Sequence, residues 1–350
     1  MFTAYHIVLY LLFIISICLS SGSKKRMWFW ICIIMLIFFA GLRLPSNYTD
    51  LDGYEILYKT GEPVDYGFGT ESVNIGYQTL NDIFHKIGFP FQFFLFFIGF
   101  LIYFSYGKFI TKYSPNILLS LCIFYMIDFS FSLILLRQFI AVSIGLLSFK
   151  YVIERKQLNF LICALLALSF HSTAIILFPI YYIYGIQTTK TNIIVLTILT
   201  VIITLAFNVI TNYIASFTEY YANYIGKETE SSVARTLMKI YILLVYIMAL
   251  GRDVFKKNIN YLLLICLVLN VVIYIGGTEV FGLYRIRAYF EISEIIGIPV
   301  ILSYASKKTF STNLTLKTMV FLYGGLLFWT FMRMVDNEDI YYSNIYSLFF

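Results

Sequence analysis

A polar segment, Arg43–Pro90, holds the first residues that could do chemistry on a water-soluble group. Asp50, Asp52 and Glu71 are candidate bases within it, because a carboxylate can take the proton from an attacking hydroxyl. Transfer of a sugar to a hydroxyl is a reaction of this kind, and it also needs a cation to stabilise a phosphate leaving group. Carboxylates in exposed loops are more often only solvated, so a surface charge is the alternative for each. Repeated Gly and Pro predict a segment that turns often.

Arg137 is the one cation in the otherwise apolar run 130–149. An ionised side chain within a membrane span is costly unless it faces a polar cavity or a partner. A guanidinium offers a planar fork to phosphate oxygens, so we expect Arg137 to bind an anion, with Gln138 beside it adding polarity. The alternative is a structural ion pair with Asp128 on the preceding helix.

Two further arginines, Arg285 and Arg287, directly precede a later apolar run, 288–304. Helical spacing places Arg287 on one face with Glu291 and Glu294, whereas Arg285 shares a face with Tyr289. Arg287 therefore has acids to pair with, and Arg285 is the freer of the two to bind a ligand.

His171 lies in an apolar stretch, where a histidine is more often a hydrogen-bonded core residue, and Ser172 is a local partner. The sequence has no second His or Cys at ligand spacing, so we expect no metal site. It also contains no P-loop or GxGxxG, and we expect no cofactor. The five cysteines all fall in apolar runs and are expected to be core residues.

The composition indicates a membrane protein, with 60% hydrophobic and 13% charged residues. Apolar runs of roughly 17 to 25 residues recur, which is the length that crosses a bilayer as helix. We expect an all-α polytopic integral membrane protein with about 12 transmembrane helices, in a range of about 11 to 13. Residues 1–350 form a single transmembrane domain in this interpretation. The predicted spans are 3–20, 27–42, 91–110, 117–134, 135–153, 158–170, 172–185, 193–215, 237–251, 260–277, 288–304 and 316–334.

Short basic loops between these spans are expected to face the cytoplasm. The segment 43–90 then becomes one long outward-facing loop between the second and third spans. We expect the first run to be a retained span, because its basic cluster follows it instead of preceding it. Leu158–Gly185 is either a hairpin of two short helices or one tilted span, and the interruption at His171 favours the hairpin.

Several short motifs occur in a fixed order along the chain, next to the predicted spans. They are Gly41-Leu42-Arg43, Tyr48-Thr49-Asp50 with Tyr54, Gly76-Tyr77-Gln78-Thr79-Leu80-Asn81, Leu136-Arg137-Gln138, His171-Ser172-Thr173-Ala174 and Tyr284-Arg285 to Tyr289-Phe290. Together they resemble the EpsG-type branch of the Wzy polysaccharide polymerases of bacterial envelopes. The family commonly has Gly where Tyr48 stands, and an acid where Asn74 stands. The identity of a catalytic acid in the loop therefore stays open.

The resemblance implies a glycosyltransferase with a GT-C-like fold in the bacterial inner membrane, its active face toward the periplasm. Such enzymes join oligosaccharide repeat units carried on polyprenyl pyrophosphate into O antigen, capsule or exopolysaccharide. By position, Arg137 and Arg285 would hold the pyrophosphate, Asp50 or Glu71 would act on the acceptor, and His171 would assist. The residues expected to bind substrate are Arg43, Tyr54, Gln138, Tyr284, Arg287 and Tyr289.

Two other interpretations of the sequence stay open. One is an O-antigen ligase or another glycosyltransferase that uses lipid-linked sugars, and the other is a polysaccharide flippase or transporter. The resemblance also makes a chain-length regulator and a flippase plausible partners, besides membrane lipids and the lipid-linked oligosaccharide. No nucleic-acid partner is expected, since the basic residues are scattered in short loops.

Overall fold

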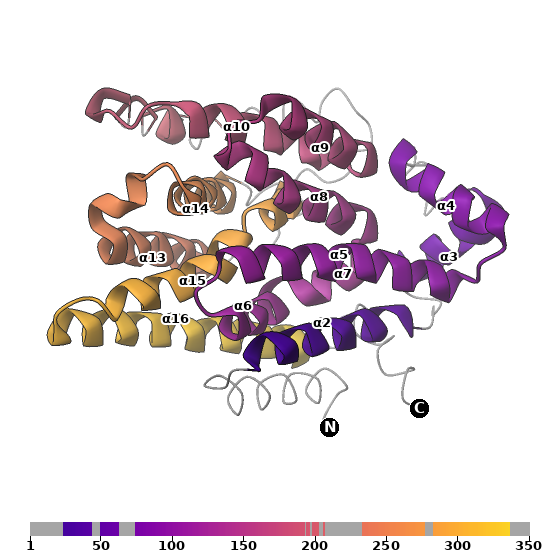
Figure 1. The fold of residues 1–350 in the computed structure, drawn as a ribbon, viewed down its shortest axis with the longest axis horizontal. Helices are drawn as coiled ribbons and strands as arrows, with labels where there is room; N and C mark the ends of the chain where they lie inside the picture. Colours follow the sequence, from indigo (N-terminus) through magenta and orange to yellow (C-terminus); the bar gives the residue numbers. More distant parts are fainter. Residues whose placement is uncertain are drawn as a thin grey trace.

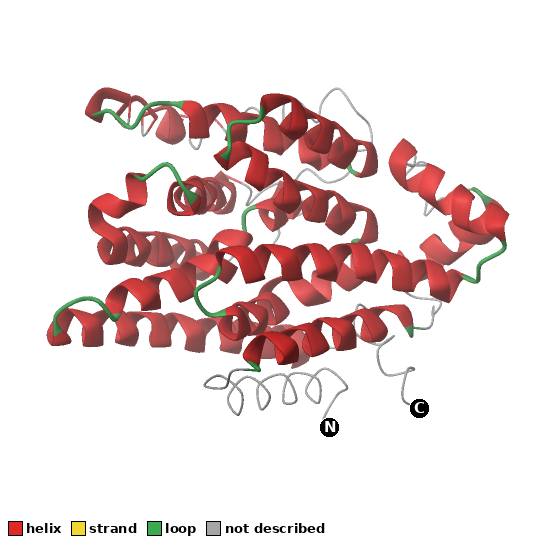
Figure 2. Ribbon diagram, viewed as in Figure 1, coloured by secondary structure: helices red, strands yellow, loops and turns green. Residues whose placement is uncertain are grey.

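The computed structural model describes residues 24–43, 50–62, 74–202 apart from 193 and 197, 206, 233–276 and 283–336. The predicted first span, most of the predicted span 193–215, and Glu71 lie outside the described residues. Within them the chain is almost entirely helical and has no strand (Figure 2). The expectation of an all-α protein is therefore confirmed for the part of the chain that the structure describes.

The helices follow the predicted spans closely, and most of their ends differ by only a few residues. The helices are α2 (Lys25–Gly41), α5 (Phe91–Tyr113), α6 (Ile117–Phe124), the π-helix η1 (Tyr125–Phe129), α7 (Ser130–Ile134), α8 (Leu136–Ile153), α9 (Gln157–Phe170), the 3₁₀ helix η2 (Ser172–Ile176), α10 (Leu177–Gly185), α13 (Val233–Leu250), the 3₁₀ helix η3 (Gly251–Phe255), α14 (Ile259–Gly276), the 3₁₀ helix η5 (Leu283–Tyr289), α15 (Ile292–Ala305) and α16 (Phe310–Asp336).

Five stretches of helix are long and apolar enough to cross a membrane, among the residues that were searched. They are Phe91–Tyr113, Ile117–Ile134, Leu136–Ile153, Val233–Phe255 and Phe310–Met332. This is a membrane protein with several apolar helices. Other predicted spans correspond to shorter apolar helices such as α9 and α15, so the number of twelve crossings stays a prediction.

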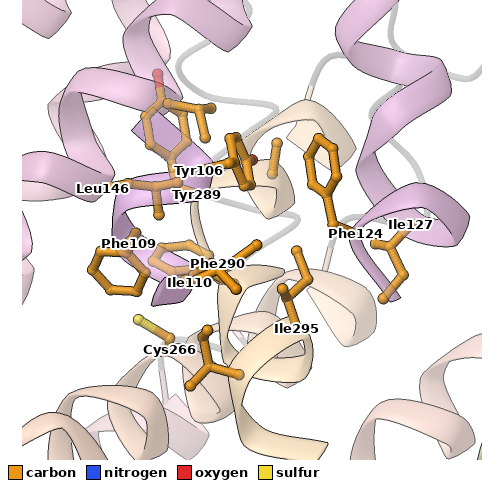
Figure 3. Close-up of a cluster of buried hydrophobic side chains, with 14 of the residues drawn as sticks. Tyr106, Phe109, Ile110, Phe124, Ile127, Leu146, Cys266, Tyr289, Phe290 and Ile295 are labelled. Atoms are coloured by element: carbon orange, nitrogen blue, oxygen red, sulfur yellow. The ribbon is translucent and has the colours of Figure 1, made fainter. Parts of the chain in front are cut away.

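The bundle is built in layers. α5 packs between α2 and α8, and α8 packs in turn against α9, as Figure 1 shows. In the second half of the chain, α15 packs against α13, α14 and α16, and it also contacts α6 of the first half. Figure 3 shows the joint between the halves, where Tyr106, Phe109 and Phe124 meet Phe290 and Ile295. The core therefore ties the two halves together, and the outward faces of α13 and α16 keep apolar side chains exposed, as lipid-facing helices do.

The segment 158–185 folds back on itself. The chain breaks at His171, whose backbone is extended (φ −157°, ψ 131°) between α9 and η2. Beyond the break, the Tyr181 hydroxyl donates to the Arg155 carbonyl at 3.2 Å, and the Tyr181 ring stacks on Phe160 with centroids 4.8 Å apart. Contact between the start of α9 and the end of α10 requires an antiparallel pair, so the predicted hairpin is confirmed.

The described parts of the polar segment 43–90 are mostly helical, which its Gly and Pro content does not predict. It contains two helices, α3 (Asp50–Thr60) and α4 (Ile75–Ile87). The amide of Asn81 on α4 donates to the Leu57 carbonyl on α3 at 3.2 Å, and the Tyr58 hydroxyl donates to the Phe89 carbonyl at 2.7 Å. α4 ends at Gly88, whose positive φ of 85° suits a glycine at a helix C-terminus.

Candidate functional site

Elements from distant parts of the sequence pack along α8 and on the adjoining end of α9. α3 reaches it through Tyr54, and the first turn of α4 packs on the last turn of α9, where Gly76 lies against Ser169. The C-terminal end of η5 packs on α8 as well, with the Tyr289 ring beside Gly145. The polar segment, the hairpin tip and η5, which carry most of the predicted site residues, thus border the same helix.

Arg137 lies half-buried in the first turn of α8, beside a pair of tyrosines. Its guanidinium carbon is 5.9 Å from the centroid of the Tyr54 ring. The Tyr54 ring in turn packs on Tyr77 of α4, with centroids 5.5 Å apart and an interplanar angle of 56°. A cation near an aromatic face is stabilised by the ring quadrupole, so α3 and α4 help to place this arginine.

Tyr77 is a member of this site that the sequence interpretation did not select. Its side chain is fully buried, and its hydroxyl has no hydrogen-bond partner among the described residues. Burial raises the pKa of Tyr77 well above its ordinary value, the neighbouring Tyr54 phenol raises it further, and the positive charge of Arg137 lowers it. Tyr77 is therefore a neutral phenol that keeps an O–H to donate near Arg137. In the sequence, the only indication that Tyr77 belongs to the site was its place in the Gly76-Tyr77 motif.

Asp128 is not the ion-pair partner of Arg137 that the structural alternative required. Its Oδ2 accepts a hydrogen bond from the Tyr106 hydroxyl at 2.8 Å, and its electrostatic neighbours are Glu291 and Arg287. The alternative of an Asp128–Arg137 pair is therefore wrong, because Asp128 is engaged with other elements.

Arg43 is buried at the end of α2 and is bonded to backbone. Its Nε donates to the Ala40 carbonyl at 2.9 Å, and its Nη1 donates to the Leu133 carbonyl. These bonds tie α2 to α7, just before α8 begins. Gln138, the neighbour of Arg137, is also buried, with 1% of its surface exposed.

His171 is held at the hairpin tip by its own loop. Its Nδ1 accepts from the Thr173 backbone N–H at 3.3 Å and lies 2.7 Å from the Thr173 hydroxyl. Since Nδ1 accepts, the neutral ring carries its proton on Nε2. The Thr173 hydroxyl lies 3.3 Å from the Tyr289 hydroxyl, so this tip is linked to η5. The sequence suggested Ser172 as the hydrogen-bond partner of His171, whereas in the structure the partner is Thr173.

Arg287 is held inside the protein. Its Nε lies 3.4 Å from Glu291 Oε1, its Nη1 donates to the Tyr274 hydroxyl at 2.8 Å, and its guanidinium covers the Phe131 ring at 4.8 Å. The predicted pairing with Glu291 is confirmed. Glu294 instead pairs with another cation, Lys239.

Three predicted site residues are placed only by their backbone. Asp50 is the first residue of α3, and Tyr284 and Arg285 lie in η5, but their side chains are outside the described set, as is the whole of Glu71. Among the residues searched, no group of His, Cys, Asp and Glu could hold a metal ion. The described part of the site is thus one arginine at a helix start, two tyrosines whose rings pack at a tilt, and a hydrogen-bonded histidine loop. It offers positive charge and aromatic surface.

Comparison with curated proteins found no match, and comparison with solved structures found none. The model of the EpsG family does match, over residues 26–346. This range includes every motif named above and the helices from α2 to α16 except Lys25, the first residue of α2, so the match covers the bundle together with its candidate site. The chain belongs to the EpsG family.

Proposed function

We propose that this protein is a membrane glycosyltransferase that polymerises oligosaccharide repeat units carried on polyprenyl pyrophosphate. Membership of the EpsG family supports the coarser part of this proposal, a role in the membrane like that of a polysaccharide polymerase. The observation that carries the finer part is Arg137, which the bundle holds at a helix start beside Tyr54 and Tyr77.

The reaction needs a cation next to the leaving pyrophosphate. The acceptor hydroxyl attacks the anomeric carbon of the donor sugar, the bond from that carbon to the pyrophosphate oxygen breaks, and negative charge develops on the lipid pyrophosphate. A preorganised guanidinium at that oxygen stabilises the charge, and loss of one such donor typically costs about 10²–10³ in rate. We assign this role to Arg137, and we assign a similar role to Arg285 from its position in η5.

The acceptor side needs a base and a surface for sugar. Asp50, the first residue of α3, and Glu71 are the carboxylates that we propose for the proton of the attacking hydroxyl. Tyr54 presents a half-buried ring next to Arg137, and such a ring can stack on the apolar face of a sugar. Tyr77 is fully buried, and its ring supports the Tyr54 ring at this position.

The proposal places the reaction at the outward face of the bacterial inner membrane, where segment 43–90 would cover the donor. The product would be O antigen, capsule or exopolysaccharide. The fold would be of the GT-C type, and a chain-length regulator and a flippase would be its partners in the membrane.

The first experiment compares surface polysaccharide on gels from cells that lack the gene and from the same cells complemented with variants. Arg137→Ala should fail to restore long polymer and should leave single repeat units. Arg252→Ala, at an exposed position in η3, is the matched control and should restore the full ladder. Protein levels in the membrane must be equal for the two variants.

Other results would separate the alternatives. Complete loss of repeat units from the surface in the deletion strain would indicate a ligase or a flippase. A full ladder from Arg137→Ala cells would remove this residue from the reaction.

A further inference from the structure

A cluster of ionisable side chains lies buried between the two halves of the bundle. It contains the carboxyl groups of Asp128, Glu291 and Glu294 and the cations Arg287 and Lys239. Asp128 and Glu294 are fully buried, and Glu291 is 2% exposed. Charged groups within a membrane protein are costly, so each needs a specific partner.

One part of the cluster is completely satisfied. Glu294 Oε1 accepts from Lys239 Nζ and, at 3.2 Å, from the Asn270 amide, while Oε2 accepts from the Tyr323 hydroxyl. A carboxylate with one ammonium group and two neutral donors forms a neutral unit. This part needs no further proton.

In the other part, the described residues supply one more carboxyl group than cations. Arg287 pairs with Glu291, and Asp128 lies within electrostatic range of both Glu291 and Arg287. Asp128 Oδ2 accepts from Tyr106, but Oδ1 is buried and has no hydrogen-bond partner among the described residues. Two carboxylates facing one guanidinium would leave one negative charge uncompensated.

The backbone supports this placement of Asp128. Residues Tyr125–Phe129 form a π-helix inside the span Ile117–Ile134, and an inserted π-turn changes the direction in which later side chains point. Contacts on both sides fix the register, since Ser120 donates to the Ile295 carbonyl and Arg287 covers Phe131. Asp128 lies between these contacts, opposite Glu291.

We propose that Asp128 and Glu291 form a proton-binding site that holds one proton between their carboxyl groups. The proton satisfies the open Asp128 oxygen and makes this part of the cluster neutral, with Arg287 balancing one carboxylate. Two carboxylic acids that face each other at close range cannot both ionise cheaply, which is the physical basis of such a shared proton.

The site couples protonation to the position of η5. The groups that face the pair are Tyr106 from α5, Arg287 from η5 and Tyr274 from α14, with Lys239 and Tyr323 also within electrostatic range of Glu291. Loss of the proton would draw Arg287 toward two carboxylates and displace η5, which also carries Tyr289. An effect on polymerisation rests on the proposed function, whereas the proton itself does not.

The proton can be observed directly. Infrared spectra of the purified protein at neutral pH should show the carbonyl band of a protonated carboxylic acid, shifted to lower frequency in D₂O. Asp128→Asn should remove this band. Asp82→Asn, the same change at a partly exposed position on α4, is the control and should leave it. Absence of the band in the wild type, or its persistence in Asp128→Asn, would overturn the proposal.

Thermal unfolding of purified variants gives a second test that does not depend on activity. An amide can donate as the shared proton does, so Asp128→Asn and Glu291→Gln should each unfold near the wild-type temperature. The double variant leaves Arg287 without a carboxylate and should unfold at a temperature lower by about 5–10 °C. If each single variant is markedly more stable than the wild type, both acids are ionised and the proposal fails. These outcomes are independent of whether the protein is a polymerase.

Discussion

The substitution Gly76→Ala tests how closely the polar segment must pack on the hairpin, because it adds a Cβ atom at the contact. An ideal Cβ there would lie 2.4 Å from the Ser169 Oγ and 2.9 Å from both the carbonyl carbon and the carbonyl oxygen of Ser169. The hydroxyl can rotate away, but the backbone of α9 cannot. The start of α4 must therefore retreat by roughly 0.5 Å to reach ordinary contact distance.

This retreat has a predictable cost. Overpacking of a tight helix contact destabilises a protein by about 1–3 kcal/mol. Gly76→Ala also moves the adjacent Tyr77, which packs on Tyr54 beside Arg137. A misplacement of about 1 Å can cost about 10²-fold in rate, so we expect polymer yield to fall much more than protein level.

The assay compares polysaccharide ladders at matched amounts of membrane-inserted protein. Gly324→Ala is the control, because a Cβ at this helical glycine meets nothing within 4 Å. Gly76→Ala/Ser169→Ala should remain defective, since the backbone contact persists when the hydroxyl is removed. A full ladder from Gly76→Ala would refute the packing argument, and recovery in the double variant would show that only the hydroxyl obstructs the new methyl group.

Three further predictions concern single contacts. Arg137→Lys keeps the charge but loses the planar fork, so polymer yield on gels should fall by about tenfold or more; a normal ladder would contradict phosphate recognition by this residue. Lys239→Met leaves Glu294 buried without its cation and should lower the free energy of unfolding by about 3–5 kcal/mol, with recovery in Lys239→Met/Glu294→Gln; thermal unfolding measures both. Tyr289→Phe removes the 3.3 Å contact with Thr173 and should cost about 0.5–1.5 kcal/mol by the same measurement; a larger loss would mean that the hydroxyl has another partner.

The apolar runs of the sequence were sufficient to locate the apolar helices, though not the helices of the polar segment. The run 91–110 predicts α5, and the break at His171 predicts the hairpin, because a long apolar stretch in lipid can satisfy its backbone only as helix. Periodicity also predicts the pairing of Arg287 with Glu291, since residues four apart lie on the same face of a helix.

The helices of the polar segment could not be found in the same way. α3 and α4 lie in a stretch with glycines, prolines and acidic residues, and their stability comes from packing against each other and against α9. Tertiary contacts of this kind leave no periodic apolar signal that is strong enough to outweigh the turn residues. For the same reason, the burial of Tyr77 was visible only in the structure.

The ion pair between Asp128 and Arg137, which the sequence left open as an alternative, is absent for a geometric reason among the described residues. The π-turn at Tyr125–Phe129 adds a residue to one turn and rotates the later residues of the helix by about 100°. Asp128 consequently meets Tyr106 and Glu291, which belong to α5 and to the second half of the chain.

The candidate site residues stand where helices are interrupted. Arg137 follows a break at Leu135, where φ is −91° and ψ is 58°, and His171 is itself the break between α9 and η2. Tyr289 ends the 3₁₀ helix that precedes α15. Irregular backbone at membrane depth is tolerated only where protein or a water-filled cavity supplies hydrogen bonds. The three interruptions bring Arg137, His171 and Tyr289 to helix ends beside α8, where each side chain lies next to irregular backbone.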